Sequence, residues 1–280
     1  SQILVKFIQL NKWPPKFNDI IFMFQKELGE KIIGNYSSKN YGRLSILTNY
    51  RLKILNPKIQ IKGFESLNKN EWYLTTSNHQ SWADIFMVQM LTNRKIPMLK
   101  FFMKHVLIYV PVIGICWWAL DMPFLKRYTK EQIKKNPKLK GRDFKEMRKS
   151  LNHYSLHPVS VFSYAEGTRF THKKHTAQES PYNNLLKPKE GGMALALSVI
   201  PSIKFLIDIT IIYESPKRSF WDYLCGRLKN IKIFVKKIEI PKEFLNEKLA
   251  EDDRLRSNFK ALLNNIWKDK DDLISAESFK

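Results

Sequence analysis

Two short stretches of the chain combine chemically active residue types with a fixed spacing. In the first, Asn78–Asp84, His79 and Asp84 place an imidazole and a carboxylate five positions apart. The second, Glu166–Arg169, is a glycine turn that carries an arginine directly after an apolar run. A histidine oriented by a carboxylate can act as a general base, and arginine offers a planar fork that suits phosphate. Together the stretches indicate a base beside a phosphate clamp.

The first stretch also has a purely structural interpretation. Ser81 and Asp84 form the pattern of a capping box, which predicts a helix over residues 81–92. This role of Asp84 needs no catalysis, and it leaves His79 in the loop just before the helix. Across such a junction the two side chains can meet, so that Asp84 accepts from one ring nitrogen and leaves the other as the base.

The second stretch has a structural alternative as well. Gly167 allows a sharp turn after a strand, and Thr168 and backbone N–H groups can add to the phosphate contacts of Arg169. The alternative is a surface ion pair between Arg169 and Glu166. Taken alone, this turn is weaker evidence than the histidine and aspartate.

Short β-rich runs alternate with helical patterns from residue 58 onward. The expected strands cover residues 58–62, 72–76, 96–99, 159–164, 205–213 and 231–236, and the expected helices cover residues 81–92, 141–155, 190–198 and 243–267. This alternation predicts an α/β domain over residues 58–280 whose largely parallel sheet is flanked by helices. Both stretches directly follow an expected strand, where the active sites of such sheets gather.

Residues 1–57 have a different pattern, with apolar residues at helical spacing among basic ones. Over residues 17–33 and 41–55 this spacing predicts an amphipathic two-helix segment. Such a pair packs on the domain by default, or it lies in a membrane interface. No apolar run reaches the length of a membrane-spanning helix. Because the chain does not begin with Met, the sequence leaves open whether a membrane segment precedes it.

The net charge of +22 is concentrated in two regions. Residues 1–62 and residues 125–150 each carry 11 basic and 3 acidic residues, which gives 11 − 3 = +8 for each region. Such a field attracts nucleic acid, an anionic membrane face or acidic substrates. The second region has only Tyr128 and Phe144 as aromatics, and no nucleic-acid-binding motif occurs, so we expect no nucleic-acid partner. A non-catalytic lipid-binding protein is a further alternative, against which the intact base pattern argues.

The two stretches resemble motifs of the glycerolipid acyltransferase family, whose familiar member is 1-acyl-glycerol-3-phosphate (lysophosphatidate) acyltransferase. His79 and Asp84 match the family's His-x-x-x-x-Asp box, and residues 166–169 match its Glu-Gly-Thr-Arg box. Their order along the chain is that of the family. The resemblance is closest to the branch of lysophospholipid acyltransferases.

Two further blocks extend the resemblance. Lys104, Pro111 and Gly114 resemble a Lys/Pro/Gly block that lies between the two boxes. Val199–Pro201 resembles a fourth block, a hydrophobic strand with a proline. The resemblance covers roughly residues 58–240. The N-terminal two-helix segment also resembles the membrane-docking helices of some family members, which implies that it docks on a membrane.

The resemblance implies a role for each matched residue. His79 would be the general base and Asp84 would orient it. The acceptor and its phosphate would be held by Lys104, Glu166, Gly167, Thr168 and Arg169. The family uses no metal and no cofactor, since the acyl donor is a co-substrate.

The resemblance also implies the reaction and its partners. The enzyme would move a fatty acyl group from acyl-CoA, or from acyl-acyl carrier protein, to the free hydroxyl of 1-acyl-glycerol-3-phosphate, giving phosphatidic acid. Another lysophospholipid, in phospholipid remodelling, is the alternative acceptor. The protein would act at a phospholipid surface on the cytoplasmic face of a membrane, with the bacterial inner membrane as the expected place.

Three minor expectations concern burial. The apolar segments Val106–Leu120 and Met193–Leu206 could line an acyl channel or fill the core, and we expect core. Only Cys116 and Cys225 occur in the chain, so no disulfide framework is indicated. Cys116 lies in the first of these segments and is expected to be a buried thiol. His172 and His175 lie in a Lys-rich loop and are expected to be solvated.

Overall fold

The computed structural model describes residues 58–110, 113–125, 148–215, 218–219, 222–223, 227–228 and 230–278. The predicted two-helix segment lies outside the described residues, and the predicted boundary at residue 57 stays a prediction. No helix within the described ranges is long and apolar enough to cross a membrane. The chain divides into two compact units, of which Ile59–Tyr213 with Ile231–Lys280 is the larger. In the smaller unit, Asp222 accepts from the backbone and hydroxyl of Ser219 and pairs with Arg227.

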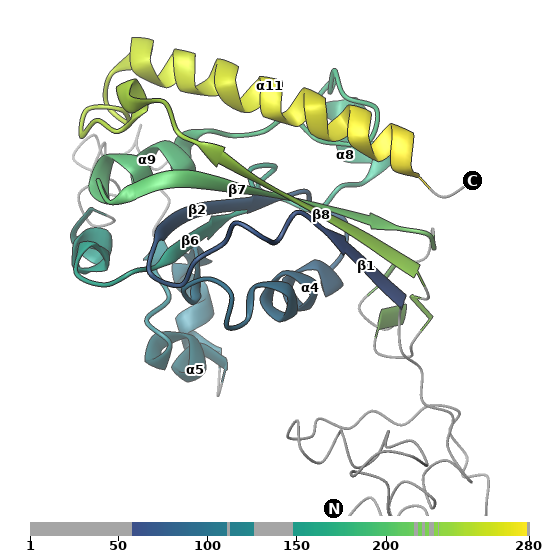
Figure 1. The fold of residues 1–280 in the computed structure, drawn as a ribbon, viewed down its shortest axis with the longest axis horizontal. Coiled ribbons are helices and arrows are strands. Elements are labelled where there is room, and N and C mark those ends of the chain that lie inside the picture. The colour runs from purple at the N-terminus through teal and green to yellow at the C-terminus, as the bar shows by residue number, and fades with distance from the viewer. Residues whose placement is uncertain are drawn as a thin grey trace, which may run out of the picture. The chain divides into compact units, whose positions relative to one another are not determined.

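A six-stranded sheet forms the centre of the larger unit (Figure 1). Its strand order is β1-β8-β7-β2-β6-β3. The strands are β1 Lys58–Lys62, β2 Trp72–Ser77, β3 Leu99–Phe101, β6 Ser160–Ser163, β7 Ile203–Tyr213 and β8 Asn230–Glu239. The strand β2 pairs in parallel with β6 and β7, β3 pairs in parallel with β6, and β8 runs antiparallel to β7. The predicted largely parallel sheet is confirmed, and the strand expected at 96–99 lies three residues later.

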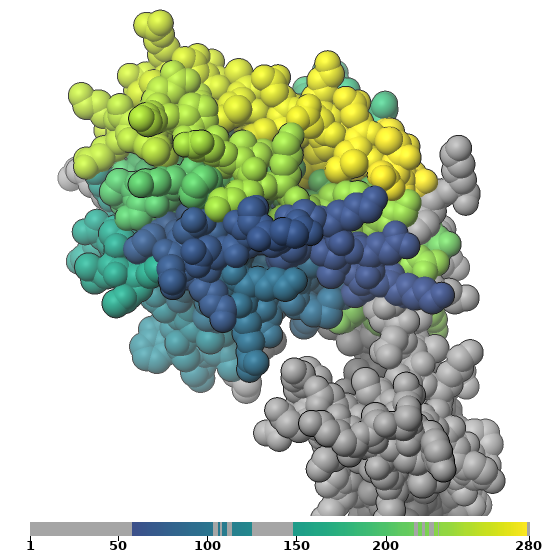
Figure 2. Space-filling view, in the orientation of Figure 1, coloured from purple at the N-terminus to yellow at the C-terminus, as the bar shows by residue number. Residues whose placement is uncertain are grey.

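Helices flank this sheet on both sides. The helices α4 Ala83–Thr92 and α5 Ile113–Ala119 lie on one side, and α9 Gly191–Val199 and α11 Asp253–Glu277 lie on the other (Figure 1). The space-filling view shows α11, in yellow, lying along one side of the fold (Figure 2). The remaining elements are short: β4 Met103–Lys104 with β5 Phe124–Leu125, α8 His172–Ala177, and the 3-10 helices η1 His105–Tyr109, η3 Asn152–Ser155 and η4 Lys242–Phe244.

The core follows from sequence runs that are apolar without interruption. β7 is almost wholly buried, as expected for a central strand covered on both faces. α9 is buried all round from Met193 to Val199, and the prediction that this segment fills the core is confirmed. The block Val199–Pro201 is not a strand, because it forms the end of α9 and the turn before β7.

The segment Val106–Leu120 does not fill the core. Its larger side chains are exposed at most described positions: Val106, Tyr109, Val110, Ile115, Trp118 and Leu120. Cys116 is exposed as well, so the expectation of a buried thiol was wrong. Phe86 and Met90 on α4, and Trp82 directly before it, are also exposed, at helical spacing. The described surface therefore carries large apolar side chains on α4 and on the segment Val106–Leu120.

The C-terminal helix begins later than the sequence pattern predicted. η4 ends at Phe244, and α11 begins only at Asp253, where the side chain of Asp252 accepts from the backbone of Arg254 and Leu255. This N-cap satisfies two of the backbone donors that open the helix. One face of α11 is buried at positions three or four apart: Phe259, Leu263, Ile266, Trp267, Lys270 and Ile274.

A fully buried lysine joins α11 to the sheet. The ammonium of Lys270 lies 2.7 Å from Asp208 on β7 and donates to the carbonyl of Ile209 at 2.8 Å. It also lies over the ring of Trp267, 4.7 Å from the centroid. The side chain of Lys270 is 0% exposed and that of Asp208 is 7% exposed. Removal of either partner would leave a buried charge without compensation.

We expect Lys270→Ala to lower the free energy of unfolding by about 3–5 kcal/mol, the typical loss when one partner of a buried ion pair is removed. The matched control is Lys236→Ala, because Lys236 pairs with Asp269 at the surface, with side chains 64% and 67% exposed. We expect a loss of at most about 1 kcal/mol for the control. Urea unfolding measures both, and equal losses would contradict the assigned role of Lys270.

Candidate active site

The candidate site lies where three parallel strands end. His79 follows β2 in the loop before α4, Glu166 follows β6, and Tyr213 is the last residue of β7. Because the strands are neighbours and parallel, their carboxyl ends meet at the same edge of the sheet. The prediction that both motifs lie at strand ends is confirmed by these elements.

Asn78 fixes the start of the loop that carries His79. Its side-chain amide donates to the carbonyl of Ile211 on β7, and its side-chain oxygen accepts from the N–H of the same residue, both at 2.9 Å. Asn78 is 1% exposed, so these bonds lie in the protein interior. The loop that carries His79 is therefore attached to the neighbouring strand.

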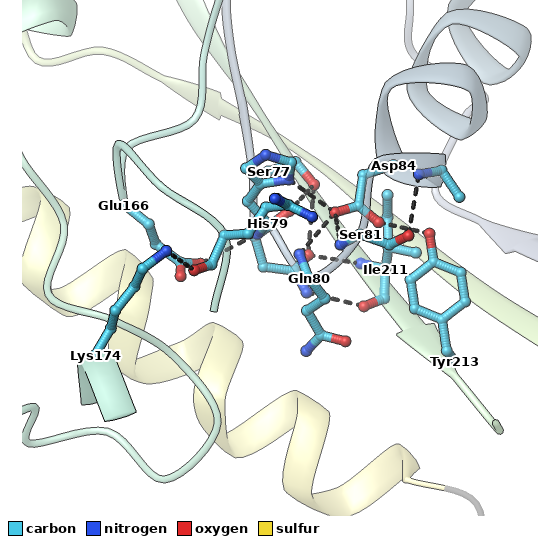
Figure 3. Close-up of polar contacts among 12 residues, drawn as sticks. Ser77, His79, Gln80, Ser81, Asp84, Glu166, Lys174, Ile211 and Tyr213 are labelled. Atoms are coloured by element: carbon cyan, nitrogen blue, oxygen red, sulfur yellow. Dashed lines mark hydrogen bonds and ion pairs between the residues drawn. The ribbon is translucent and has the colours of Figure 1, made fainter. Parts of the chain in front are cut away.

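His79 and Asp84 are in direct contact (Figure 3). The ring nitrogen Nδ1 of His79 lies 3.0 Å from Oδ2 of Asp84. Because an ionised carboxylate can only accept, Nδ1 carries the proton and Nε2 is left as the basic atom. The expectation that the two side chains meet across the junction is met by this geometry.

The same oxygen of Asp84 organises the start of α4. Oδ2 accepts from the backbone N–H groups of Gln80 at 2.7 Å and Ser81 at 2.8 Å. The helix begins at Ala83, two residues later than predicted, and the hydroxyl of Ser81 accepts from the N–H of Ala83. Asp84 thus makes the contact of a capping box while it also holds the histidine.

The other oxygen of Asp84 is bound by Tyr213. The hydroxyl of Tyr213 donates to Oδ1 at 2.5 Å, and both side chains are buried. Asp84 therefore accepts from Tyr213, two backbone N–H groups and His79 at once. Tyr213 was not among the predicted site residues, and the signal that could have found it is a hydroxyl at the end of a largely apolar, buried strand.

A tyrosine ring supports the imidazole from one side. The rings of His79 and Tyr164 are stacked, with centroids 3.9 Å apart and planes 14° apart. The side chain of His79 is 12% exposed. Burial, together with the charge of Asp84, raises the pKa of Tyr164 well above its ordinary value, so this phenol stays neutral. Stacking and the bond to Asp84 fix the ring plane, which gives Nε2 a defined direction.

Glu166 points inward and does not pair with Arg169. Its Oε1 accepts from the backbone N–H of His79 at 3.2 Å, and its Oε2 accepts from that of Leu186 at 3.3 Å. Burial raises the pKa of Glu166 to about 8, although these two bonds and the charge of Lys270 oppose the rise. The alternative of a surface ion pair in this motif is therefore wrong. Glu166 links the histidine loop to the segment before α9.

The turn after β6 is joined to the loop between β2 and α4 that carries His79. Gly167 has φ of 68°, a conformation that L side chains rarely adopt. The N–H of Phe170 donates to the carbonyl of His79 at 2.7 Å. The guanidinium of Arg169 lies over the ring of Trp82, 5.0 Å from its centroid. A hydrogen bond and a cation–ring contact thus join the two motifs that the sequence predicted to act together.

Two predicted features fall outside this cluster. Lys104 belongs to β4, and the position of its side chain lies outside what the structure describes. His175 is half-buried and bonds the carbonyl of Tyr182, so the expectation that it is solvated was wrong, whereas His172 is exposed. Among the described residues there is no group of three or more His, Cys, Asp or Glu placed to hold a metal ion.

Comparison with known proteins identifies the family of the chain. The model of the acyltransferase family matches residues 58–213, more than half of the chain, and the chain belongs to this family. The 1-acyl-sn-glycerophosphate (LPA) acyltransferase PlsC from Thermotoga maritima matches over 80% of this chain and 75% of its own, with 15% identity and a TM-score of 0.48. Membership of the family rests on the family model.

Curated relatives match over a short stretch only. Ribosomal RNA small subunit methyltransferase A from Azorhizobium caulinodans is 43% identical over 51 residues, and that from Bradyrhizobium diazoefficiens is 37% identical over 51 residues. Each match covers 18% of this chain and 18% of the methyltransferase. The chain thus spans less than a fifth of these relatives, and the stretch does not carry their activity over.

We expect Tyr213→Phe to lower kcat for acyl transfer about tenfold, since one hydrogen bond to a charged group contributes about 1.5–3 kcal/mol. The acceptor KM should change little, because Tyr213 binds Asp84 and not the substrate. The matched control is Tyr182→Phe, whose hydroxyl bonds Asn264. Steady-state kinetics compare the two variants, and a kcat for Tyr213→Phe equal to that of the control would refute the role of this phenol.

The pKa of Glu166 also predicts how stability depends on pH. The folded state holds a proton up to about pH 8, whereas the unfolded carboxyl releases it near 4.5. Since the folded state then binds more protons, this residue makes the free energy of unfolding fall as pH rises between these values. Urea unfolding at several pH values should show this fall in the native chain and less of it in Glu166→Gln. Identical slopes would contradict the assignment.

Proposed function

We propose that this acyltransferase moves a fatty acyl group to the free hydroxyl of 1-acyl-glycerol-3-phosphate and so produces phosphatidic acid. The observation that carries the proposal is the pair formed by His79 and Asp84, in which Nδ1 is bound and Nε2 is left for an acceptor hydroxyl. The resemblance of the Glu-Gly-Thr-Arg turn beside it supports a phosphorylated acceptor. Thr168 and Arg169 hold the phosphate, with Lys104 as a further phosphate ligand.

The reaction balances without a covalent enzyme intermediate. Nε2 of His79 takes the proton of the acceptor hydroxyl while its oxygen attacks the carbonyl carbon of the thioester. A C–O bond forms, and the tetrahedral intermediate then breaks its C–S bond. The imidazolium returns the proton to the leaving thiolate, which departs as the free thiol of CoA or acyl carrier protein. Asp84 stabilises the imidazolium during these steps.

Each group around the histidine has one task in this scheme. Tyr213 and two backbone N–H groups hold Asp84, which keeps Nδ1–H and so fixes the tautomer. Tyr164 fixes the ring plane. Glu166 joins the histidine loop to the turn that binds the acceptor. Neither a metal nor a cofactor takes part in the proposed scheme.

The proposal includes attachment to a phospholipid surface. The exposed apolar side chains of α4, η1 and α5, Trp118 and Trp82 among them, support it because aromatic side chains favour the membrane interface. The net charge of +22 favours an anionic leaflet. We place the enzyme on the cytoplasmic face, in a bacterium on the inner membrane, and propose no nucleic-acid partner.

A second acceptor is the alternative within the same chemistry. A lysophospholipid with a larger headgroup would use the same base and the same acyl donor. Its product would serve phospholipid remodelling and not phosphatidate synthesis. An acyl transfer assay with both kinds of acceptor separates the two functions.

We expect His79→Ala to lower the rate of acyl transfer at least about a hundredfold, because general base catalysis contributes about 10²–10⁴-fold in rate. The assay uses purified full-length protein with vesicles, labelled oleoyl-CoA or acyl-acyl carrier protein, and a panel of lysophosphatidate, other lysophospholipids and glycerol 3-phosphate. The matched control is His157→Ala, since His157 is exposed. Thermal unfolding checks that both variants are folded.

Product formed from lysophosphatidate and lost in His79→Ala would support both the acceptor and the base. Product from another lysophospholipid alone would replace the acceptor and keep the mechanism. Turnover by His79→Ala near that of His157→Ala would sink the general-base assignment.

A further inference from the structure

Three basic side chains surround the turn after β6. Arg169 belongs to the turn itself, Lys174 comes from α8, and Lys189 comes from the segment that leads to α9. Only Arg169 belongs to the motif recognised in the sequence. The two lysines are brought to the turn by the fold.

Lys174 is attached to the turn by two hydrogen bonds. Its ammonium donates to the hydroxyl oxygen of Thr168 at 2.7 Å and to the carbonyl of Arg169 at 3.1 Å. Thr171 caps α8 by accepting from the N–H of Lys174, which fixes the backbone from which the lysine extends. Figure 3 shows Lys174 approaching from the side of Glu166. Because the oxygen of Thr168 accepts from Lys174, the hydroxyl hydrogen of Thr168 is left to donate to a ligand.

Lys189 reaches the same turn from the other segment. Its backbone N–H donates to the carbonyl of Ala165 at 2.7 Å. Its ammonium lies 3.6 Å from the position that a Cβ on Gly167 would take. The glycine thus leaves the space beside the lysine open. An anion seated on the turn at Gly167 would therefore lie close to this ammonium.

No acidic side chain in the described part of the chain neutralises these three cations. Glu166 is the acidic residue of the turn, but it points inward, and burial raises its pKa to about 8. Glu190, the neighbour of Lys189, pairs with Arg256 at 3.0 Å. The turn therefore carries an excess of positive charge beside the base. Such a site attracts a ligand with more than one negative charge.

We propose that Lys174 and Lys189 complete, with Thr168 and Arg169, a binding site for a phosphate monoester, and that this site selects acceptors with a doubly charged headgroup. This inference rests on the proposed function and extends it to substrate selection. A phosphate monoester carries a charge of about −1.5 to −2 at pH 7, and a phosphodiester headgroup carries about one negative charge. Removal of one cation should therefore affect the monoester more strongly than the diester.

Two sources of a phosphate monoester exist in the reaction. One is the headgroup of the acceptor, and the other is the 3′-phosphate of CoA. The hydrogen bond from the N–H of Phe170 to the carbonyl of His79 joins the turn to the histidine. This connection favours the headgroup of the acceptor as the source, because the acceptor hydroxyl must reach Nε2 while its phosphate is held. Separate measurements of the two KM values distinguish the sources.

The test compares Lys174→Gln, Lys189→Gln and the double variant with Lys173→Gln and Lys187→Gln. The last two remove exposed lysines one and two positions away. We expect each of the first two to raise the KM for lysophosphatidate about tenfold, as for the loss of one charge-assisted hydrogen bond. The kcat, the KM for acyl-CoA and the KM for lysophosphatidylcholine should stay near the values of the controls.

Calorimetric binding of glycerol 3-phosphate, with glycerophosphocholine as the diester control, gives a readout that needs no turnover. Preferential monoester binding, lost in the double variant, would support the site even if no acceptor is acylated and the proposed function fails. Equal KM values and equal binding in all variants would overturn the proposal. A rise in the KM for acyl-CoA alone would overturn the acceptor assignment and give the site to the donor.

Discussion

One buried carboxylate holds the active end of this protein together. Asp84 accepts from the backbone N–H groups of Gln80 and Ser81 in the loop between β2 and α4, from the imidazole of His79 and from the hydroxyl of Tyr213 on β7. The donors thus belong to the loop that carries His79 and to a neighbouring strand of the sheet. A buried carboxylate needs such partners, because an unpaired charge in the interior is strongly unfavourable. The four bonds that compensate the burial of Asp84 thus include the one that would orient His79 in the proposed mechanism.

Glu166 also joins separate segments of the site, but burial raises its pKa to about 8. It binds only neutral backbone N–H groups, from His79 and Leu186, and its interior position favours the protonated form at neutral pH. Glu166 and Asp84 lie at the same end of the sheet but are held by different partners. A neutral Glu166 does not compete with the anion that the neighbouring cations attract, which keeps the turn available for a ligand.

The sequence specified the chemistry better than the supporting structure. His79 with Asp84, the strands of the sheet and the buried α9 were predictable because their signals are local spacing and unbroken apolar runs. Tyr213 was not predictable, because its partner lies 129 positions away in sequence and no periodicity marks it. Lys174 could not be distinguished from its neighbours in a Lys-rich stretch. Its orientation depends on the hydrogen bond by which Thr171 caps α8, and that bond is visible only in the folded chain. The exposed segment around Trp118 was misjudged because apolar composition alone does not tell a core from a surface.

The position of α11 has a consequence for how the chain is made. Asp208 lies in β7, but the lysine that compensates its charge and Asp271, which accepts from the backbone N–H groups of Asn183 and Asn184, both belong to α11. The family match ends at residue 213, before this helix. During synthesis the sheet therefore leaves the ribosome with a carboxylate that has no interior partner, and it must wait for some sixty further residues, or several seconds at the usual rate of translation. The interior of the larger unit is therefore complete only after α11 has emerged.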